Sequence, residues 1–303
     1  MKDNLSKEIK EICLKEGFFK IGIAKYEKLT DEVNHLKKWI SEGRNADMDW
    51  ISRNTEKREN ASLILNGIKS IISLAYIYDT PFEHKDSLPK ISRYAWGEKD
   101  YHKVLKKKLK AVCKEIENLC EGAETKFYVD DGPLMEKVWA VKSGIGWMGK
   151  HSNVIDADAG SFFFLSEILI NKELDYDKPV DDLCETCRVC VDACPTGAIY
   201  DEYKVDANLC ISYQTIENRN DIPSYIDLSG WIFGCDICQD VCPFNRKKFF
   251  TDDKSFYPML EVFEKSAEEL KKMDEEEFRN VFESSPVKRT KFTGWKRNLE
   301  RVL

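Results

Sequence analysis

The chain has 303 residues, of which 42% are hydrophobic and 33% charged, an ordinary mixture for a protein that can bury a sizeable core. Its formal net charge of -7 argues against indiscriminate binding to polyanions, while leaving room for a local basic face. No run of about 18 apolar residues predicts a membrane span. The charged N-terminal residues also lack the apolar core of a secretory leader. We therefore expect a cytoplasmic protein.

Four stretches rich in β-branched and aromatic residues predict the buried strands of one sheet. They are Phe18–Ala24, Ser70–Tyr78, Lys126–Asp130 and Phe162–Ile170. Apolar residues at three- and four-residue spacing from Asp100 predict an amphipathic helix that ends at Gly122. A second helix is expected to begin at Pro133 and to be capped by Gly144. Residues 1–178 are therefore expected to form a mixed α/β domain.

The cysteines are concentrated in one segment that follows a charged, proline-containing linker at Asp175–Asp182. Eight of the eleven lie between positions 184 and 242, and in a reducing compartment such density indicates metal binding or catalysis. Four have the spacing C-x2-C-x2-C-x3-C before a proline, the bacterial ferredoxin run whose fourth cysteine ligates the neighbouring cluster. These are Cys184, Cys187, Cys190 and Cys194. A second set repeats the end of that pattern and takes its missing first member from upstream, namely Cys210, Cys235, Cys238 and Cys242.

This spacing predicts two 4Fe–4S clusters. One is assigned to Cys184, Cys187, Cys190 and Cys242, and the other to Cys194, Cys210, Cys235 and Cys238. An exchange of Cys194 and Cys242 between the clusters stays open. Structural zinc is the alternative, but zinc ribbons pair two C-x2-C knuckles instead. The expected fold class is α+β: the mixed α/β domain, a ferredoxin-like domain at 179–248, and a short helical tail at 249–303.

Weaker patterns leave two interpretations each. Gly144, Gly146 and Gly149 match the G-x-G-x-x-G dinucleotide fingerprint, but a helix precedes them where a strand is required. Asp130 follows a strand and precedes a turn, so it is either a turn residue or a proton donor. The basic stretch Pro286–Leu303, with interleaved aromatic residues, suits either RNA or solvent. Five lysines within Lys103–Lys110 form a second candidate patch.

Taken together, several segments resemble the epoxyqueuosine reductase family, cobalamin-dependent enzymes that complete queuosine in tRNA. They lie in the family's order between positions 48 and 246 and include MDWISRNTEKREN, ISRYAWGEKDYHKVLKKKLK, YVDDGPLMEKVWAVKSGIGWMGKHSNVI, GSFFFLSEILI, CETCRVCVDACPTGAI, DANLCISYQTIE and FGCDICQDVCPFNR. The tail SSPVKRTKFTGWKRN is similar to the family's closing motif. Many members continue into helical repeats, whereas this chain stops at Leu303, so we expect a short form.

The resemblance implies that an epoxide on the wobble base of a tRNA anticodon is reduced, with electrons passing from an external low-potential donor through the clusters to cobalamin. It implies that Asp130 donates a proton. It also implies a cofactor pocket that involves Arg93, Tyr94, Tyr101, His102, Lys137, Gly146, Lys150 and His151. Asp100 and His102 begin like a cobalt-ligating motif, but Leu105 replaces its glycine, so no histidine ligand is predicted.

Two other functions remain as alternatives. The first is a cytosolic corrinoid and iron–sulfur reductase that acts on a small molecule. The second is a non-catalytic electron carrier, which ranks last because a ferredoxin needs no additional domain of about 175 residues with its own sheet.

Overall fold

The structure is a computed structural model that describes residues 2–247 and 249–303, with side chains described from Asn4 onward. Its main sheet has four strands in the order β1-β2-β7-β4, and all neighbouring pairs are antiparallel. The strands are β1 (Lys20–Lys25), β2 (Ser70–Ile77), β7 (Phe163–Ile170) and β4 (Thr125–Tyr128). These are the four stretches that the sequence pattern predicts, so this part of the prediction is confirmed.

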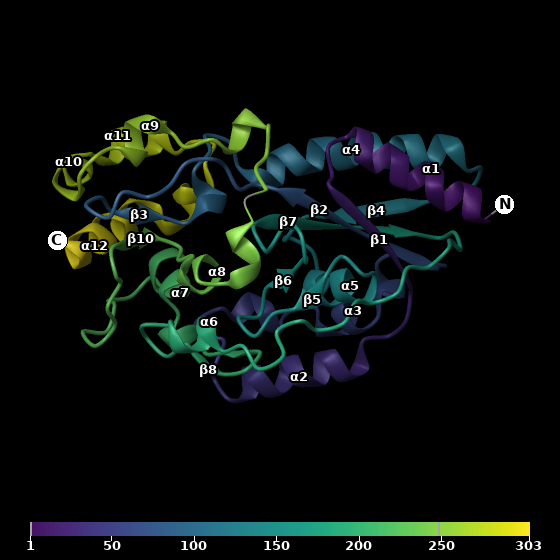
Figure 1. The fold of residues 1–303 in the computed structure, drawn as a ribbon, viewed down its shortest axis with the longest axis horizontal. Coiled ribbons are helices and arrows are strands. Elements are labelled where there is room, and N and C mark those ends of the chain that lie inside the picture. The colour runs from purple at the N-terminus through teal and green to yellow at the C-terminus, as the bar shows by residue number, and fades with distance from the viewer. Residues whose placement is uncertain (1, 248) are drawn as a thin grey trace.

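Helices cover both faces of the sheet (Figure 1). One face, which includes Ile72 and Ile168, packs against α1 (Lys2–Lys15) and α4 (Tyr101–Leu119). The opposite face is covered by α5 (Glu136–Lys142), with α3 (Thr55–Glu59) and α2 (Thr30–Ser41) beyond it (Figure 1). Side chains alternate between the faces along each strand, so each strand contributes to two cores.

The ends of α4 and α5 follow the sequence signals closely. Asp100 caps α4, because its carboxylate accepts the backbone N–H of His102 at 3.0 Å. Gly122 lies in the turn that follows this helix, with a φ of +68°. Helix α5 begins at Glu136, three residues later than predicted from Pro133. Gly144 adopts a φ of +75° just after α5, as its predicted capping role requires.

The cysteine-rich segment consists of short elements. They are α6 (Val189–Asp192), β8 (Ile199–Asp201), β9 (Lys204–Val205), α7 (Ile211–Ile216), β10 (Trp231–Phe233) and α8 (Ile237–Asp240). β8 pairs with β9, while β10 pairs in parallel with β3 (Lys90–Ile91), which precedes this segment by more than ninety residues. A further hairpin joins β5 (Trp147–Met148) to β6 (Val154–Ile155). The segment is therefore connected to the first part of the chain by strand pairing.

The C-terminal residues form the predicted helical tail, and its apolar side chains build a second core. The helices are α9 (Leu260–Phe263), α10 (Ala267–Lys271), α11 (Glu275–Val281) and α12 (Lys291–Val302). Phe278, Phe282 and Trp295 pack together, and Trp295 is 0% exposed. The apolar side of α12 contacts β10, so tertiary packing decides what these charged helices do. Within the part of the chain that the structure describes, no helix is long and apolar enough to cross a bilayer.

Candidate active site

The first group of thiols lies around a small cavity of about 20 Å³. Cys184, Cys187, Cys190 and Cys242 line it together with Lys150, His151 and Phe244. The indole of Trp147 donates a hydrogen bond to the Cys184 sulfur at 3.4 Å. Burial, followed by the nearby Cys184 and Cys242 thiols, raises the pKa of Cys190 to about 11. A bound metal would supply the positive charge that converts such thiols to thiolates, so the donor set fits a cluster.

The second group consists of Cys194, Cys210, Cys235 and Cys238. Burial raises the pKa of Cys235, and the charges of Cys210 and Cys194 raise it further. Burial raises the pKa of Cys238, and the charge of Cys190, a member of the first group, contributes to the same shift. The two groups are therefore neighbours. The structure thus brings the eight cysteines together in the two sets of four that the spacing predicts. Among the described residues, no three or more acidic, histidine or cysteine side chains are arranged to hold a single metal ion.

A second, much larger cavity has a volume of about 1100 Å³. Its wall comes from α2, η1 (Asp49–Ser52), α5, the loop after β4, and the β8–β9 hairpin. Broad apolar side chains dominate it: Leu36, Trp39, Trp50, Ile51, Leu134, Met135, Val138, Met148 and Tyr200. Lys137 extends into this cavity, and desolvation there lowers its pKa, opposed first by Asp130 and then by Cys238. The second thiol group therefore lies within electrostatic reach of the cavity.

Asp130 lies at the edge of the large cavity, in the loop after β4. Its carboxylate accepts the O–H of Tyr101 at 2.7 Å, and its backbone N–H donates to Glu136 Oε1 at 2.6 Å. Its φ of +55° is unusual for a residue other than glycine, and such strain is common at functional sites. The Tyr101 ring is stacked on Phe164, with centroids 4.2 Å apart, so the hydroxyl is held rigidly.

Comparison with known proteins identifies the family. The family described as "4Fe-4S double cluster binding domain" matches residues 183–245, and "Epoxyqueuosine reductase QueG, DUF1730" matches residues 58–131. An epoxyqueuosine reductase of Cellulophaga algicola is 40% identical, over 99% of this chain and 98% of the relative. The chain belongs to the epoxyqueuosine reductase family. As a member it is an oxidoreductase with a double 4Fe–4S domain, and the predicted reduction of epoxyqueuosine in tRNA is confirmed for the family.

Other epoxyqueuosine reductases extend this comparison. The Escherichia coli relative is 36% identical, and the match covers 99% of this chain and 81% of the relative. A solved epoxyqueuosine reductase with an epoxyqueuosine-modified tRNA-Tyr stem loop superposes with a TM-score of 0.91 at 28% identity, over 99% of this chain and 81% of that one. A catabolic reductive dehalogenase reaches a TM-score of 0.50 at 12% identity and shares the fold alone. The electron-carrier and small-molecule alternatives are therefore set aside in favour of the epoxyqueuosine reductase reaction.

Four other residues of the predicted cofactor pocket lie in two separate parts of the structure. Tyr94 packs near Tyr101, with ring centroids 6.0 Å apart, and His102 pairs with Asp100 at 2.7 Å beside them. Lys150 and His151 instead lie at the first thiol group, 2% and 4% exposed. The Lys150 ammonium donates to the Glu185 carbonyl at 2.6 Å and thereby supports the cysteine loop.

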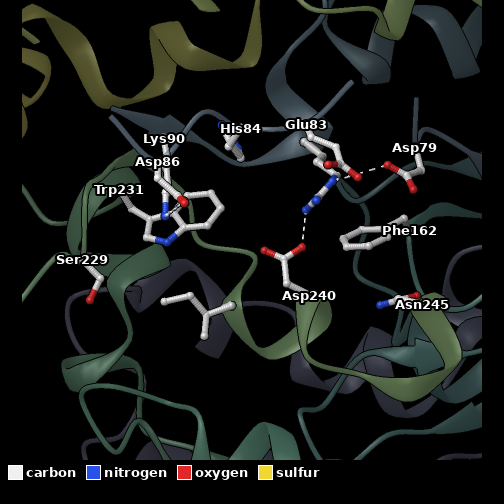
Figure 2. Close-up of a pocket in the computed structure, with 12 residues that line it drawn as sticks. Asp79, Glu83, His84, Asp86, Lys90, Phe162, Ser229, Trp231, Asp240 and Asn245 are labelled. Atoms are coloured by element: carbon white, nitrogen blue, oxygen red, sulfur yellow. Dashed lines mark hydrogen bonds and ion pairs between the residues drawn. The ribbon is translucent and has the colours of Figure 1, made fainter. Parts of the chain in front are cut away.

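Two other predicted residues lie outside the wall of the large cavity. A Cβ at Gly146 would lie 2.0 Å from the Ile155 carbonyl, so glycine is needed there for the close approach of β5 and β6. Arg93 lines a separate pocket of about 400 Å³. Its guanidinium contacts Asp79 and Asp236, each at 3.4 Å, and Asp240. Figure 2 shows the carboxylates of Asp79 and Asp240 on two sides of this pocket, with Phe162 nearby.

The basic tail is largely occupied by contacts within the protein. Five of its six cations bind carbonyl groups or Glu217, namely Lys288, Arg289, Lys296, Arg297 and Arg301. Because Trp295 is fully buried, its ring is not available to stack on a base. The aromatic part of the RNA interpretation is therefore wrong for this residue, since the ring fills the C-terminal core. Besides its contact with Glu217, the Arg289 guanidinium lies 6.0 Å above the ring of Trp50, a residue of the cavity wall.

Two residues that the sequence analysis did not single out lie directly behind Asp130. Glu136, the first residue of α5, accepts the Asp130 N–H, and Glu167 lies in the middle of β7 at 0% exposure. The available signal was a glutamate within the apolar stretch FFFLSEILI, where every neighbour predicts a buried strand. An acidic residue that is predicted to be buried, with no basic residue in the same strand to pair with it, is a candidate functional group.

Proposed function

We propose that this chain reduces epoxyqueuosine to queuosine at the tRNA wobble position, with cobalamin in the large cavity and Asp130 as proton donor. The epoxide oxygen leaves as water, which requires two electrons and two protons. The observation that carries the proposal is the position of the cavity, which has Asp130 on its wall and the second thiol group within electrostatic reach of its Lys137.

The cavity fits a large, flat cofactor. Its volume of about 1100 Å³ exceeds the roughly 300–1,000 Å³ of pockets for ordinary small ligands, and its wall is mainly apolar. The Arg58 Nε atom is buried there without a hydrogen-bond partner among the described residues. This N–H group is therefore available to donate to a polar substituent of the cofactor. When bound, cobalamin would supply a metal centre that accepts electrons singly and delivers them to the epoxide carbon.

The role proposed for Asp130 rests on its geometry. Tyr101 orients one carboxylate oxygen, while the backbone contact to Glu136 fixes the loop. Asp131, by contrast, pairs with Lys106 and accepts the backbone N–H of Val129, so it fills the structural role expected of an acid in a turn. A Bacillus subtilis epoxyqueuosine reductase, 27% identical with a TM-score of 0.90, is described with a catalytic aspartate loop swung out of its active site. We infer that Asp130 is the corresponding acid here.

We propose an electron route that begins at the first thiol group and ends at the second. The loop around Cys184 reaches the surface, where Leu183 and Val189 are 43% and 44% exposed. An external low-potential electron donor docks most favourably at this apolar surface. The surface lies over the first thiol group, which is the group farther from Lys137 and the large cavity. The cluster ligands are those assigned from spacing: Cys184, Cys187, Cys190 and Cys242, and Cys194, Cys210, Cys235 and Cys238.

The remaining residues of the predicted pocket support the site from outside the cavity. We propose that Tyr94 and His102 hold the start of α4 and its Tyr101, while Arg93 anchors Asp236 between two cysteines of the second group. Gly146, Lys150 and His151 shape the wall of the first group. The substrate base enters past Trp50, 44% exposed, whose ring offers a stacking surface to an unpaired base. Because tRNA is the substrate, we place the protein in the cytoplasm.

The test is cobalamin dependence. Anaerobically reconstituted protein is titrated with cobalamin while its absorbance is recorded, and then assayed with tRNA that carries epoxyqueuosine. We expect an absorbance change on binding, and queuosine formation only when cobalamin and a reductant are both present. Queuosine formed at the full rate without cobalamin would overturn the cofactor assignment.

A further inference from the structure

Glu167 occupies a position where a charged carboxylate is strongly disfavoured. It lies on the face of β7 that packs against α5, between Leu165 and Leu169, and it is 0% exposed. Its cross-strand neighbours are Ser73 on β2 and Tyr128 on β4. No N–H or hydroxyl group of the described residues donates to either carboxyl oxygen, and the contact that remains is with the Glu136 carboxyl group. Burying an unpaired carboxylate costs far more free energy than burying the neutral acid, so this position favours the protonated form of Glu167.

Glu136 connects this buried acid to the active site. Its Oε1 accepts the Asp130 N–H at 2.6 Å, and the residue also lines the large cavity. Its carboxyl group interacts directly with that of Glu167. Burial, followed by the charge of Asp130, raises the pKa of Glu136 to about 8. Burial and then Glu136 raise the pKa of Glu167 well above its ordinary range.

The charged groups around this pair do not neutralise it. Arg58 of α3 is the nearest guanidinium, but its Nη1 donates to the Leu134 carbonyl at 3.1 Å. Lys137 of α5 donates to the Ser152 carbonyl and to Asn153. From the remaining elements come two aspartates of the β4 loop and the Tyr101 hydroxyl of α4, none of which is cationic. No ion pair joins either glutamate to a cation within the described part of the chain.

The proposed reaction consumes two protons, whereas the single carboxyl group of Asp130 can carry only one at a time. We propose that Glu136, at the cavity wall, and the buried Glu167 form an acid pair that stores a proton and returns it to Asp130 in each turnover. This inference rests on the proposed role of Asp130. It assigns to both glutamates the task of resupplying the acid, so they are positioning residues that act through Asp130.

The proton steps balance as follows. Asp130 transfers its proton to the epoxide oxygen as the carbon–oxygen bond breaks, and becomes a carboxylate. Glu136 then transfers its proton to Asp130, which passes it to the same oxygen as the second carbon–oxygen bond of the epoxide breaks, so that a carbon–carbon double bond and water form. Glu167 in turn reprotonates Glu136. The two electrons come from the reductant through the clusters. Solvent protons re-enter at Glu136, the member of the pair that lines the cavity.

The first test is infrared spectroscopy of the cluster-loaded protein without substrate. The wild type is expected to show the C=O stretch of a protonated, unhydrated carboxyl group at neutral pH. Glu167→Gln should lose this band, while Glu115→Gln, a change on the exposed side of α4, should retain it. A wild-type protein without the band, or a Glu167→Gln variant that keeps it, overturns the pair. Should Glu167→Gln fold poorly, Glu136→Gln at the cavity wall is expected to shift the frequency of the band, because it replaces the group in contact with Glu167, and an unshifted band overturns the pair.

The second test measures single-turnover rates against pH. We expect Glu136→Gln to be slower by about 10²-fold, the lower end for loss of an acid–base group, with a larger solvent deuterium isotope effect and no loss of rate near pH 8. Wild-type rates and pH profile in both glutamine variants overturn the proposal. Asp130→Asn separates the two claims. If it stays active, Asp130 is not the donor, whereas the infrared band depends on the glutamates alone.

Discussion

Replacing Tyr101 with phenylalanine tests how the active-site acid is held. The change removes one hydroxyl, which donates to an Asp130 carboxylate oxygen at 2.7 Å, and leaves the ring stacked on Phe164. Tyr101 is 8% exposed, so water does not readily take the place of the lost donor. The perturbation is therefore confined to one hydrogen bond at the end of a rigid ring.

The expected magnitude follows from the negative charge that Asp130 acquires as it gives up its proton in the proposed reaction. A hydrogen bond to a charged group contributes about 1.5–3 kcal/mol, roughly twice a neutral one. If the whole of that free energy serves to orient Asp130 in the transition state, turnover falls about 10- to 150-fold, since each 1.36 kcal/mol of activation free energy changes the rate about tenfold. Substrate binding should change little, because Tyr101 is not part of the wall of the large cavity.

The assay is queuosine formation from epoxyqueuosine-containing tRNA, with the free energy of unfolding measured in parallel. The matched control is Tyr76→Phe, which removes an equivalent bond from Tyr76, 5% exposed, to Asp253 at 2.9 Å outside the cavity. Both variants should lose similar stability, and only Tyr101→Phe should lose turnover. The reasoning is refuted if Tyr101→Phe keeps the wild-type rate, or if the Tyr76 variant slows as much.

Four further predictions concern the clusters, the acid pair and the cores. Cys187→Ala and Cys210→Ala should each lose about half of the bound iron, measured by iron and sulfide analysis, because each removes a ligand of a different cluster. The free energy of unfolding should fall between about pH 4.5 and 8 and level off above, because Glu136 binds its proton more tightly in the folded chain; Glu136→Gln should flatten this slope in denaturant titrations. Arg93→Met should cost about 3–5 kcal/mol by removing the guanidinium partner of the buried Asp236 carboxylate, without weakening cobalamin binding in an absorbance titration. Trp295→Ala should destabilise the protein by about 3–5 kcal/mol in thermal or denaturant unfolding.

Each of these has an outcome that contradicts it. Loss of all iron from either cysteine variant would mean that the two clusters do not assemble independently. An unfolding free energy that rises with pH over this range would contradict the burial of Glu136 as an acid. Weaker cobalamin binding in Arg93→Met at unchanged stability would restore Arg93 to the cofactor pocket. Weaker tRNA binding by Trp295→Ala at wild-type stability would show that this ring contacts RNA.

The candidate site was partly predictable, and the pattern of success has a physical cause. The cysteine groups followed from spacing, because short runs such as Cys184 to Cys190 wrap a cluster through local chain geometry. Tyr101 followed from family resemblance, but its contact with Asp130 joins α4 to the β4 loop across 29 positions. Arg93 lies nearby in sequence and yet faces another pocket, because its ion pairs with Asp236 and Asp240 depend on how the cysteine segment folds back.

The sequence by itself determined the strands of the sheet, the ends of α4, the iron–sulfur chemistry and the family. These properties are encoded by local alternation, capping residues and ligand spacing, which need no knowledge of distant contacts. Only the tertiary structure decided that Glu167 lies against Glu136 behind Asp130, and that Trp295 fills a core and not an RNA surface. Burial and the meeting of side chains far apart in the chain are set by packing, so the acid pair became visible only in the folded protein.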